Sequence, residues 1–101
     1  MIQALGLVEV AGLCFAIATC DTMVKAANVT IVEIERAKGD GYTTIKVEGD
    51  VGAVKAACDS GEAFSKAYGK FVSAKVIARP NASTSDMFAR HEFDRKVLYR
   101  Q

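Results

Sequence analysis

The spacing of hydrophobic and polar residues changes several times along the chain, and each change marks the start of another predicted element of secondary structure. Residues 2–10 form a mostly apolar run that is short enough for one strand. Residues 29–34 and 43–47 alternate and are rich in β-branched side chains, which suit a pleated surface. A last strand is predicted over 71–78, and Pro80 ends it. Three carboxylates lie on these strands at intervals compatible with exposure to solvent: Glu9, Glu33 and Glu35.

Two segments between these strands carry apolar residues at helical spacing. The first follows Gly12 and is predicted to bury one stripe, made of Leu13, Ala16, Ile17, Cys20, Met23, Val24 and Ala27. Thr19 falls on another face, and Phe15 lies off the stripe, which favours a subunit contact for its ring. The second helix is predicted to begin at Asp50, which can cap it, and to end at Gly69. Its predicted buried stripe consists of Val54, Ala57, Cys58, Gly61, Phe64, Ser65 and Tyr68.

Two local features of the second helix carry further expectations. Gly61 costs about 1 kcal/mol relative to alanine in a helix, so the close approach of another backbone is a plausible reason for it. Glu62 and Lys66 are spaced to form an i,i+4 ion pair on the solvent side.

The predicted order of elements is β-α-β-β-α-β, which indicates a ferredoxin-like α/β (α+β) sandwich with an antiparallel sheet and helices packed on it. Residues 37–41 join the two middle strands, and the Asp-Gly step there favours a hairpin. We expect one domain over 1–80. Residues 81–101 form a C-terminal extension, predicted as a short amphipathic helix that docks on the domain or on a neighbour, with a mobile tail as the alternative.

Composition narrows the class of protein. A chain of 101 residues, half of them hydrophobic, fits one domain with a real core. The net charge of +1 is too small to produce an overall electrostatic field that would attract nucleic acid or a membrane surface. There is no apolar run of membrane-spanning length and no secretory signal, so a soluble, cytoplasmic protein is expected. The three cysteines form no metal-ligand motif and are predicted to be inert core residues: Cys14, Cys20 and Cys58.

The sequence offers no support for catalysis, a metal site or a cofactor. Its one histidine, His91, lies between two charged residues in the extension and is expected to be solvated. The glycine-rich turn over 49–52 precedes a helix but lacks the spacing of a phosphate-binding loop. We therefore expect a protein that is not an enzyme.

Four segments together resemble the hexameric shell proteins of bacterial microcompartments. They are Ala4–Glu9 (ALGLVE), Asp21–Val29 (DTMVKAANV), Gly49–Ala57 (GDVGAVKAA) and Val76–Pro80 (VIARP). The resemblance covers roughly residues 2–80. It implies a structural subunit that forms a cyclic homohexamer and tiles with neighbouring hexamers and other shell paralogues into a sheet. Such a sheet encloses enzymes in the cytoplasm and passes small metabolites through a central pore.

The resemblance also implies which residues line the pore. In the family, the loop after the second strand surrounds the sixfold axis, and here that loop contains Lys38, Gly39, Asp40 and Gly41. Many relatives have a glycine–serine–glycine version, whereas this loop is apparently one residue longer. Six copies of Asp40 would attract cations, and six inward-pointing copies of Lys38 would offset or reverse that field.

A second set of residues matches the family's hexamer–hexamer edge: Lys25, Asn28 and Arg79. The resemblance implies that the lysine stem lies along a neighbouring hexamer while its ammonium donates to backbone carbonyls. The guanidinium of the arginine can make several such contacts.

Two other functions fit the same pattern of elements. The first is a ferredoxin-like oligomeric regulatory module that binds a small effector between subunits. The second is a shell subunit whose extension recruits a partner protein.

Overall fold

Alternating β-branched residues build a four-stranded antiparallel sheet in the computed structural model, which describes residues 3–37, 39 and 41–78. The strands are β1 (Ala4–Ala11), β2 (Thr30–Arg36), β3 (Tyr42–Gly49) and β4 (Phe71–Ile77). The helices are α1 (Leu13–Ala26) and α2 (Val51–Ala67). This confirms the predicted α+β order of elements. The predicted extension over 81–101 and the domain boundary at 80 lie outside the described residues.

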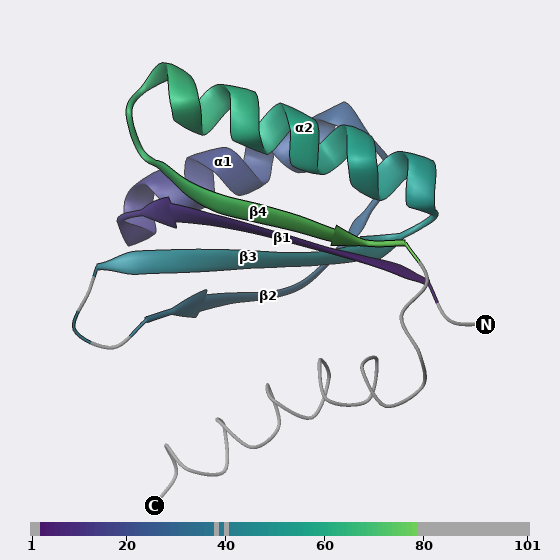
Figure 1. The fold of residues 1–101 in the computed structure, drawn as a ribbon, viewed down its shortest axis with the longest axis horizontal. Helices are drawn as coiled ribbons and strands as arrows, with labels where there is room; N and C mark the ends of the chain where they lie inside the picture. The colour runs from purple at the N-terminus through teal and green to yellow at the C-terminus, as the bar shows by residue number, and fades with distance from the viewer. Residues whose placement is uncertain (1–2, 38, 40, 79–101) are drawn as a thin grey trace, which may run out of the picture.

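The strands lie in the order β2-β3-β1-β4, so that β1 and β3 occupy the centre (Figure 1). Each neighbouring pair is antiparallel, as a ferredoxin-like fold requires. A bulge near Val32 in β2 places Ile31 opposite Val47 and Glu33 opposite Lys46. Because of this bulge, the apolar and the charged residues of β2 still match the corresponding faces of β3.

Both helices pack on the same face of the sheet (Figure 1). The core between the two layers includes Val8 and Val10 of β1, Ile45 and Val47 of β3, and Val54 of α2. Gly6 belongs to this face as well: a Cβ at this position would lie 2.6 Å from Cys58 Sγ and 2.8 Å from Val54 Cγ1. The lack of a side chain at Gly6 therefore lets α2 approach β1 closely.

The buried face of α1 differs from the predicted stripe. Ala16, Thr19 and Met23 are fully buried, whereas Leu13, Ile17 and Val24 are exposed. The cause is the contact between the two helices, because Met23 and Thr19 pack against the position of Gly61 in α2. Burial of the Thr19 hydroxyl is possible because it donates to the Phe15 carbonyl at 2.9 Å.

The ring of Phe15 packs within the chain. It stacks on Phe64, with ring centroids 5.2 Å apart, and Tyr68 completes a group of three rings. Tyr68 remains largely exposed, contrary to its predicted place in the buried stripe of α2. A subunit contact for Phe15 is not needed to explain its position, because α2 already supplies aromatic partners.

The ends of α2 confirm one prediction and correct another. Gly69 adopts a positive φ of 69°, and its N–H donates to the Lys66 carbonyl, so the helix ends where predicted. Asp50 occupies the N-cap position but its side chain makes no capping hydrogen bond. Its backbone carbonyl instead accepts from Val54 N–H at 2.9 Å, as the first turn of the helix requires.

The remaining expectations for α2 and the cysteines have mixed outcomes. The ion pair between Glu62 and Lys66 is present at 2.6 Å. Gly61 accommodates the Met23 side chain of α1 rather than a backbone, because a Cβ there would lie 2.8 Å from Met23 Cγ. Cys58 is buried as predicted, Cys20 is partly buried, and Cys14 is exposed because it lies on the outer side of α1.

Candidate functional site

The turn between β2 and β3 is a hairpin whose conformation requires glycine. The Ala37 N–H donates to the Tyr42 carbonyl at 2.8 Å, which closes the hairpin. Gly39 and Gly41 have φ values of 88° and 75°, and no atom lies within 4 Å of a Cβ built on either residue. These glycines are therefore needed for their backbone angles and not for space within the chain.

A hydrogen bond holds this turn against the start of α1. The Gly12 N–H donates to the Gly41 carbonyl at 2.7 Å, and Gly12 has a positive φ of 96°. The turn is thus positioned by two elements, the β2–β3 hairpin and the β1–α1 connection.

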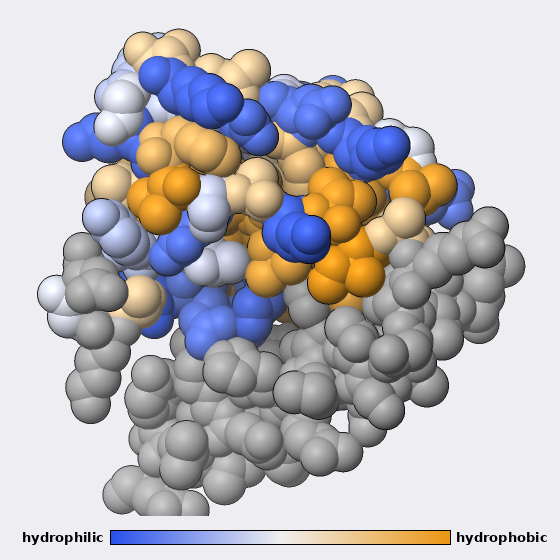
Figure 2. Space-filling view, viewed as in Figure 1, coloured by the Kyte–Doolittle hydropathy of each residue, from blue (hydrophilic) through white to orange (hydrophobic). Residues whose placement is uncertain are grey.

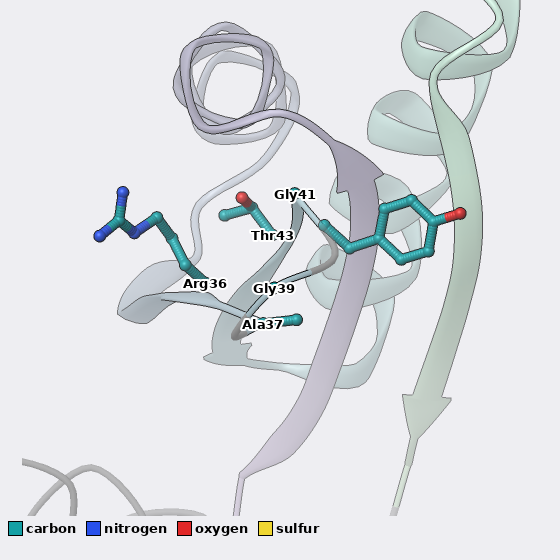
Figure 3. A pocket seen from close by; sticks show the side chains of 6 residues that line it. Arg36, Ala37, Gly39, Gly41 and Thr43 are labelled. Atoms are coloured by element: carbon teal, nitrogen blue, oxygen red, sulfur yellow. The ribbon is translucent and has the colours of Figure 1, made fainter.

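An open pocket of about 310 Å³ lies beside the turn. Its described lining consists of Arg36, Ala37, Gly39, Gly41, Tyr42 and Thr43. The Arg36 side chain extends away from the two glycines of the turn (Figure 3). Of the residues predicted to line a pore, Gly39 and Gly41 border this pocket, whereas Lys38 and Asp40 lie outside the described residues.

The predicted edge residues begin at the end of α1. Lys25 is exposed in the last turn of this helix, and Asn28 is exposed just beyond it. The Lys25 ammonium lies 2.8 Å from Asp21 Oδ2, one helical turn earlier. Both residues are accessible to a neighbouring molecule in the isolated chain, and Arg79 lies outside the described residues.

The structure also contains a charge cluster that we did not predict from the sequence. Lys46 of β3 lies 3.4 Å from Glu33 Oε1 and 2.6 Å from Glu35 Oε1, both in β2. Lys46 is 6% exposed and Glu33 is 8% exposed, so the predicted exposure of Glu33 is wrong. The signal was present in the alternation of both strands, which places opposite charges on one face. We assign it a structural role, because no nucleophile or metal-ligand set accompanies it among the described residues.

Two general properties of the described part bear on the class of protein. None of its helices is long and apolar enough to cross a lipid bilayer. Within the same residues, no group of three or more histidine, cysteine, aspartate or glutamate side chains is arranged to hold a metal ion.

The fold defines a class of small α+β domain with sheet order β2-β3-β1-β4, both helices on one face and a glycine turn at the β2–β3 end. Residues 4–80 match the sequence profile of the BMC domain. Because this match covers most of the chain, the protein belongs to the BMC domain family of bacterial microcompartment shell proteins.

Similar proteins support this assignment. The shell protein PduA of Citrobacter freundii is 44% identical over 88 residues, which cover 87% of this chain and 94% of PduA. EutM of Escherichia coli (strain K12) is 43% identical over 86 residues, with 85% and 88% coverage. PduK of Salmonella typhimurium is 45% identical over 78 residues, or 77% of this chain but only 49% of PduK. The chain thus spans about half the length of PduK and most of the length of PduA and EutM.

A solved structure has the same fold. The crystal structure of a microcompartment protein from Desulfitobacterium hafniense DCB superimposes with a TM-score of 0.68 and 26% identity. The match covers 76% of this chain and 41% of that chain. The relatives are described as shell proteins and not as enzymes, in agreement with the prediction of a non-enzymatic protein.

Proposed function

We propose that this chain is a structural subunit of a bacterial microcompartment shell in the cytoplasm, and that it works as a cyclic homohexamer. The observation that carries this proposal is the similarity to PduA and EutM over most of the length of each chain. The hexamer, its pore and its edges are the finer parts of the proposal, and each has its own support.

The hexamer is supported by an apolar surface that the isolated chain leaves exposed. Leu13, Ile17 and Val24 form a stripe along α1 at i, i+4 and i+11, on a different side from the buried Ala16 and Met23. Figure 2 shows further hydrophobic surface around the start of α2 and the end of β4. A neighbouring subunit of a ring would bury such surface, and a ring needs a heterologous contact of this kind on each subunit.

The pore is supported by the β2–β3 turn. This turn joins β2 and β3 at one end of the sheet (Figure 1), and its residues Gly39 and Gly41 have no side chains. Around a sixfold axis, six such turns would meet with their backbones close together. We propose that Lys38, Gly39, Asp40 and Gly41 line this opening and that small metabolites pass through it.

The contacts between hexamers are assigned to the other end of α1. The exposed Lys25 lies in the last turn of α1 and the exposed Asn28 lies just beyond it. We propose that Arg79 joins them in this contact. In this arrangement the proposed partners are neighbouring shell hexamers and shell paralogues laterally, and the enclosed enzymes on one side of the sheet.

Native mass spectrometry of the purified protein, followed by negative-stain imaging of the same sample, tests this function. A mass of six chains together with flat sheets or tubes is the expected result. A monomer, dimer or trimer without lateral assembly would contradict it. Isolated rings whose melting temperature rises with an added small molecule would instead favour a regulatory module.

A further inference from the structure

The exposed apolar stripe of α1, made of Leu13, Ile17 and Val24, lies on the side of this helix that points away from α2. The centre of the stripe is roughly 120° around the helix from Thr19 and Met23, which pack against α2. Helix α1 lies over β2, β3 and β1, whereas α2 lies mainly over β1 and β4. The stripe therefore lies on the side of β2, which forms one edge of the sheet.

The opposite edge of the sheet also exposes apolar side chains. It is formed by β4, with α2 packed over it (Figure 1). Val72 of β4 is 37% exposed, and a bulge leaves it without a partner in β1. Val51, at the start of α2, is 44% exposed and lies about 110° around this helix from Gly61 and Phe64, which face α1. We call the surface that contains Val51 and Val72 the β4 flank.

Both edge strands run between the proposed pore and the proposed edge of the hexamer. Strand β2 begins at Thr30, beside the proposed edge, and ends at Arg36, directly before the glycine turn. Strand β4 runs in the opposite direction: its first residue, Phe71, lies at the pore end because Phe71 and Thr43 both pair with Val10. In a ring whose axis passes beside the turn, the strand ends point inwards and outwards. The two edges of the sheet are then sides on which a subunit can meet its neighbours.

The outward side of the helical layer has charged and small residues instead. In α1 it carries the ion pair of Asp21 and Lys25, whose side chains are both exposed. In α2 it carries the exposed Asp59 together with the small residues Ala56 and Ala63. Moving these charges from water into an apolar contact would cost free energy. The apolar contacts between subunits are therefore better assigned to the two edges of the sheet.

We propose that the α1 stripe of one subunit packs on the β4 flank of the next subunit around the ring. Such a contact is heterologous, and each subunit buries both surfaces once when the ring closes. The two surfaces match in length. The stripe extends about 17 Å from Leu13 to Val24 along the helix, and β4 extends about 17 Å from Val72 to Ile77. Ile17 lies in the half of α1 nearer the pore, as Val72 does in β4, so Ile17 meets Val72 of the next subunit. This inference rests on the proposed hexamer and names the two surfaces that form it.

Two charge variants of the full-length protein, studied alone and mixed, test the proposed pairing. Ile17→Lys and Val72→Asp should each lose the hexamer in native mass spectrometry, because each leaves an unpaired charge in the apolar contact. An equimolar mixture should form hexamers again, with three copies of each variant in alternation. In that ring the introduced lysine meets the introduced aspartate at every second contact, and the native Ile17 and Val72 meet at the others. A heavy-isotope label on one variant reports the composition. A mixture that stays dissociated would overturn the pairing, and so would a Val72→Asp protein that remains hexameric.

A matched mixture distinguishes this contact from one in which the α1 stripe meets its own copy across a twofold axis. Ile17→Lys mixed with Ile17→Glu places opposite charges on two copies of the same stripe. In the proposed ring both charges meet Val72, so this mixture should stay dissociated. Hexamers or dimers formed by this pair would show that the stripe contacts itself and would overturn the proposal. Circular dichroism melting verifies that every variant is folded before its assembly is compared.

Disulfide cross-linking tests the same pairing without an introduced charge. The background is Cys14→Ser, which removes the exposed native thiol. In this background, Ile17→Cys combined with Val72→Cys should give a ladder of covalent oligomers up to the hexamer on a non-reducing gel. Ile17→Cys alone should remain a single chain. A double variant that fails to cross-link, or a single variant that forms covalent dimers, would contradict the pairing.

The wild-type protein separates this inference from the proposed function. Wild-type hexamers and sheets, observed together with a hexameric Val72→Asp variant, would move the subunit contact elsewhere and leave the shell function standing. A wild-type protein that is a monomer would overturn both.

Discussion

Gly6 shows how a single residue sets the distance between the two layers of the fold. It lies on the helix-facing side of β1, opposite Val47 and Val76 in the neighbouring strands. A methyl group there would meet Cys58 Sγ at 2.6 Å and Val54 Cγ1 at 2.8 Å, distances that packed side chains do not tolerate. The requirement is one of space, since the backbone of Gly6 lies in an ordinary strand.

We predict that Gly6→Ala lowers the free energy of unfolding by about 1–3 kcal/mol, the usual cost of overpacking a core. Urea denaturation followed by circular dichroism measures the loss. Gly61→Ala is the matched variant and should cost less. Its methyl group would press on the flexible Met23 side chain, and the better helix propensity of alanine recovers about 1 kcal/mol. A larger loss for Gly61→Ala than for Gly6→Ala would show that the helix contact, and not the layer contact, is the tighter one.

Burial also changes the acid–base chemistry of Cys58. Desolvation, with smaller effects from Asp59 and Glu62, raises the pKa of this thiol from 9.0 to about 11. Between these two values the unfolded chain has lost the thiol proton while the folded chain retains it. The free energy of unfolding should therefore fall as the pH rises from about 9 towards 11. Urea denaturation at intervals across this range measures the slope, and Cys58→Ala should make it shallower. An identical slope in the variant would exclude Cys58 as its source.

At the scale of the elements, α1 carries two apolar faces, and only one of them packs within the chain. Ala16, Thr19 and Met23 contact the rest of the domain, while Leu13 and Ile17 lie on the exposed stripe. The spacing of apolar residues predicts a helix with an apolar face but does not distinguish these two faces, because residues 16 and 17 fit the same broad stripe. Gly61 of α2 makes the distinction, since it creates the gap into which Met23 fits.

We predict that Ile17→Lys prevents formation of the hexamer without unfolding the subunit. Ile17 is 55% exposed, so a lysine there places its ammonium in water in the isolated chain but in an apolar contact in the ring. Analytical ultracentrifugation should report a smaller species, and circular dichroism an unchanged fold. Lys55→Glu, on the exposed side of α2, serves as the control. A hexamer that survives Ile17→Lys would place the subunit contact elsewhere.

At the scale of the whole molecule, the two ends of α1 serve different proposed contacts. Its start is tied to the β2–β3 turn through Gly12 and Gly41, at the proposed pore. Its last turn carries Lys25, at the proposed edge of the hexamer. Because a helix of 14 residues spans about 21 Å, one rigid element fixes the distance between the proposed pore turn and the proposed edge residue Lys25.

We predict that Lys25→Ala leaves hexamers intact and abolishes sheets. Lys25 is exposed, and its ion pair with Asp21 is also exposed, so the loss of this side chain should have little effect on folding. Native mass spectrometry reports the hexamer, and negative-stain imaging reports the sheets. Lys55→Ala removes an equally exposed lysine from α2 and should leave both unchanged. Ordered sheets of the Lys25→Ala protein would contradict the edge assignment.

Much of the fold could be predicted because its signals are local. The alternation over 43–47, the helical spacing on either side of it and the terminating Gly69 depend on neighbours within a few residues. Resemblance of four segments then indicated the family, which the match over residues 4–80 confirms. The pore and edge roles remain predictions, since they depend on contacts between chains.

What the sequence by itself determined is therefore the order of elements, the hairpin between the two middle strands and the family. Only the tertiary structure decided which face of α1 is buried and that Glu33 is withdrawn from water beside Lys46. The physical reason is the same in both cases. Burial depends on what a side chain meets across the fold, and for these residues the deciding partners lie on another helix or strand, 13 or more positions away along the chain.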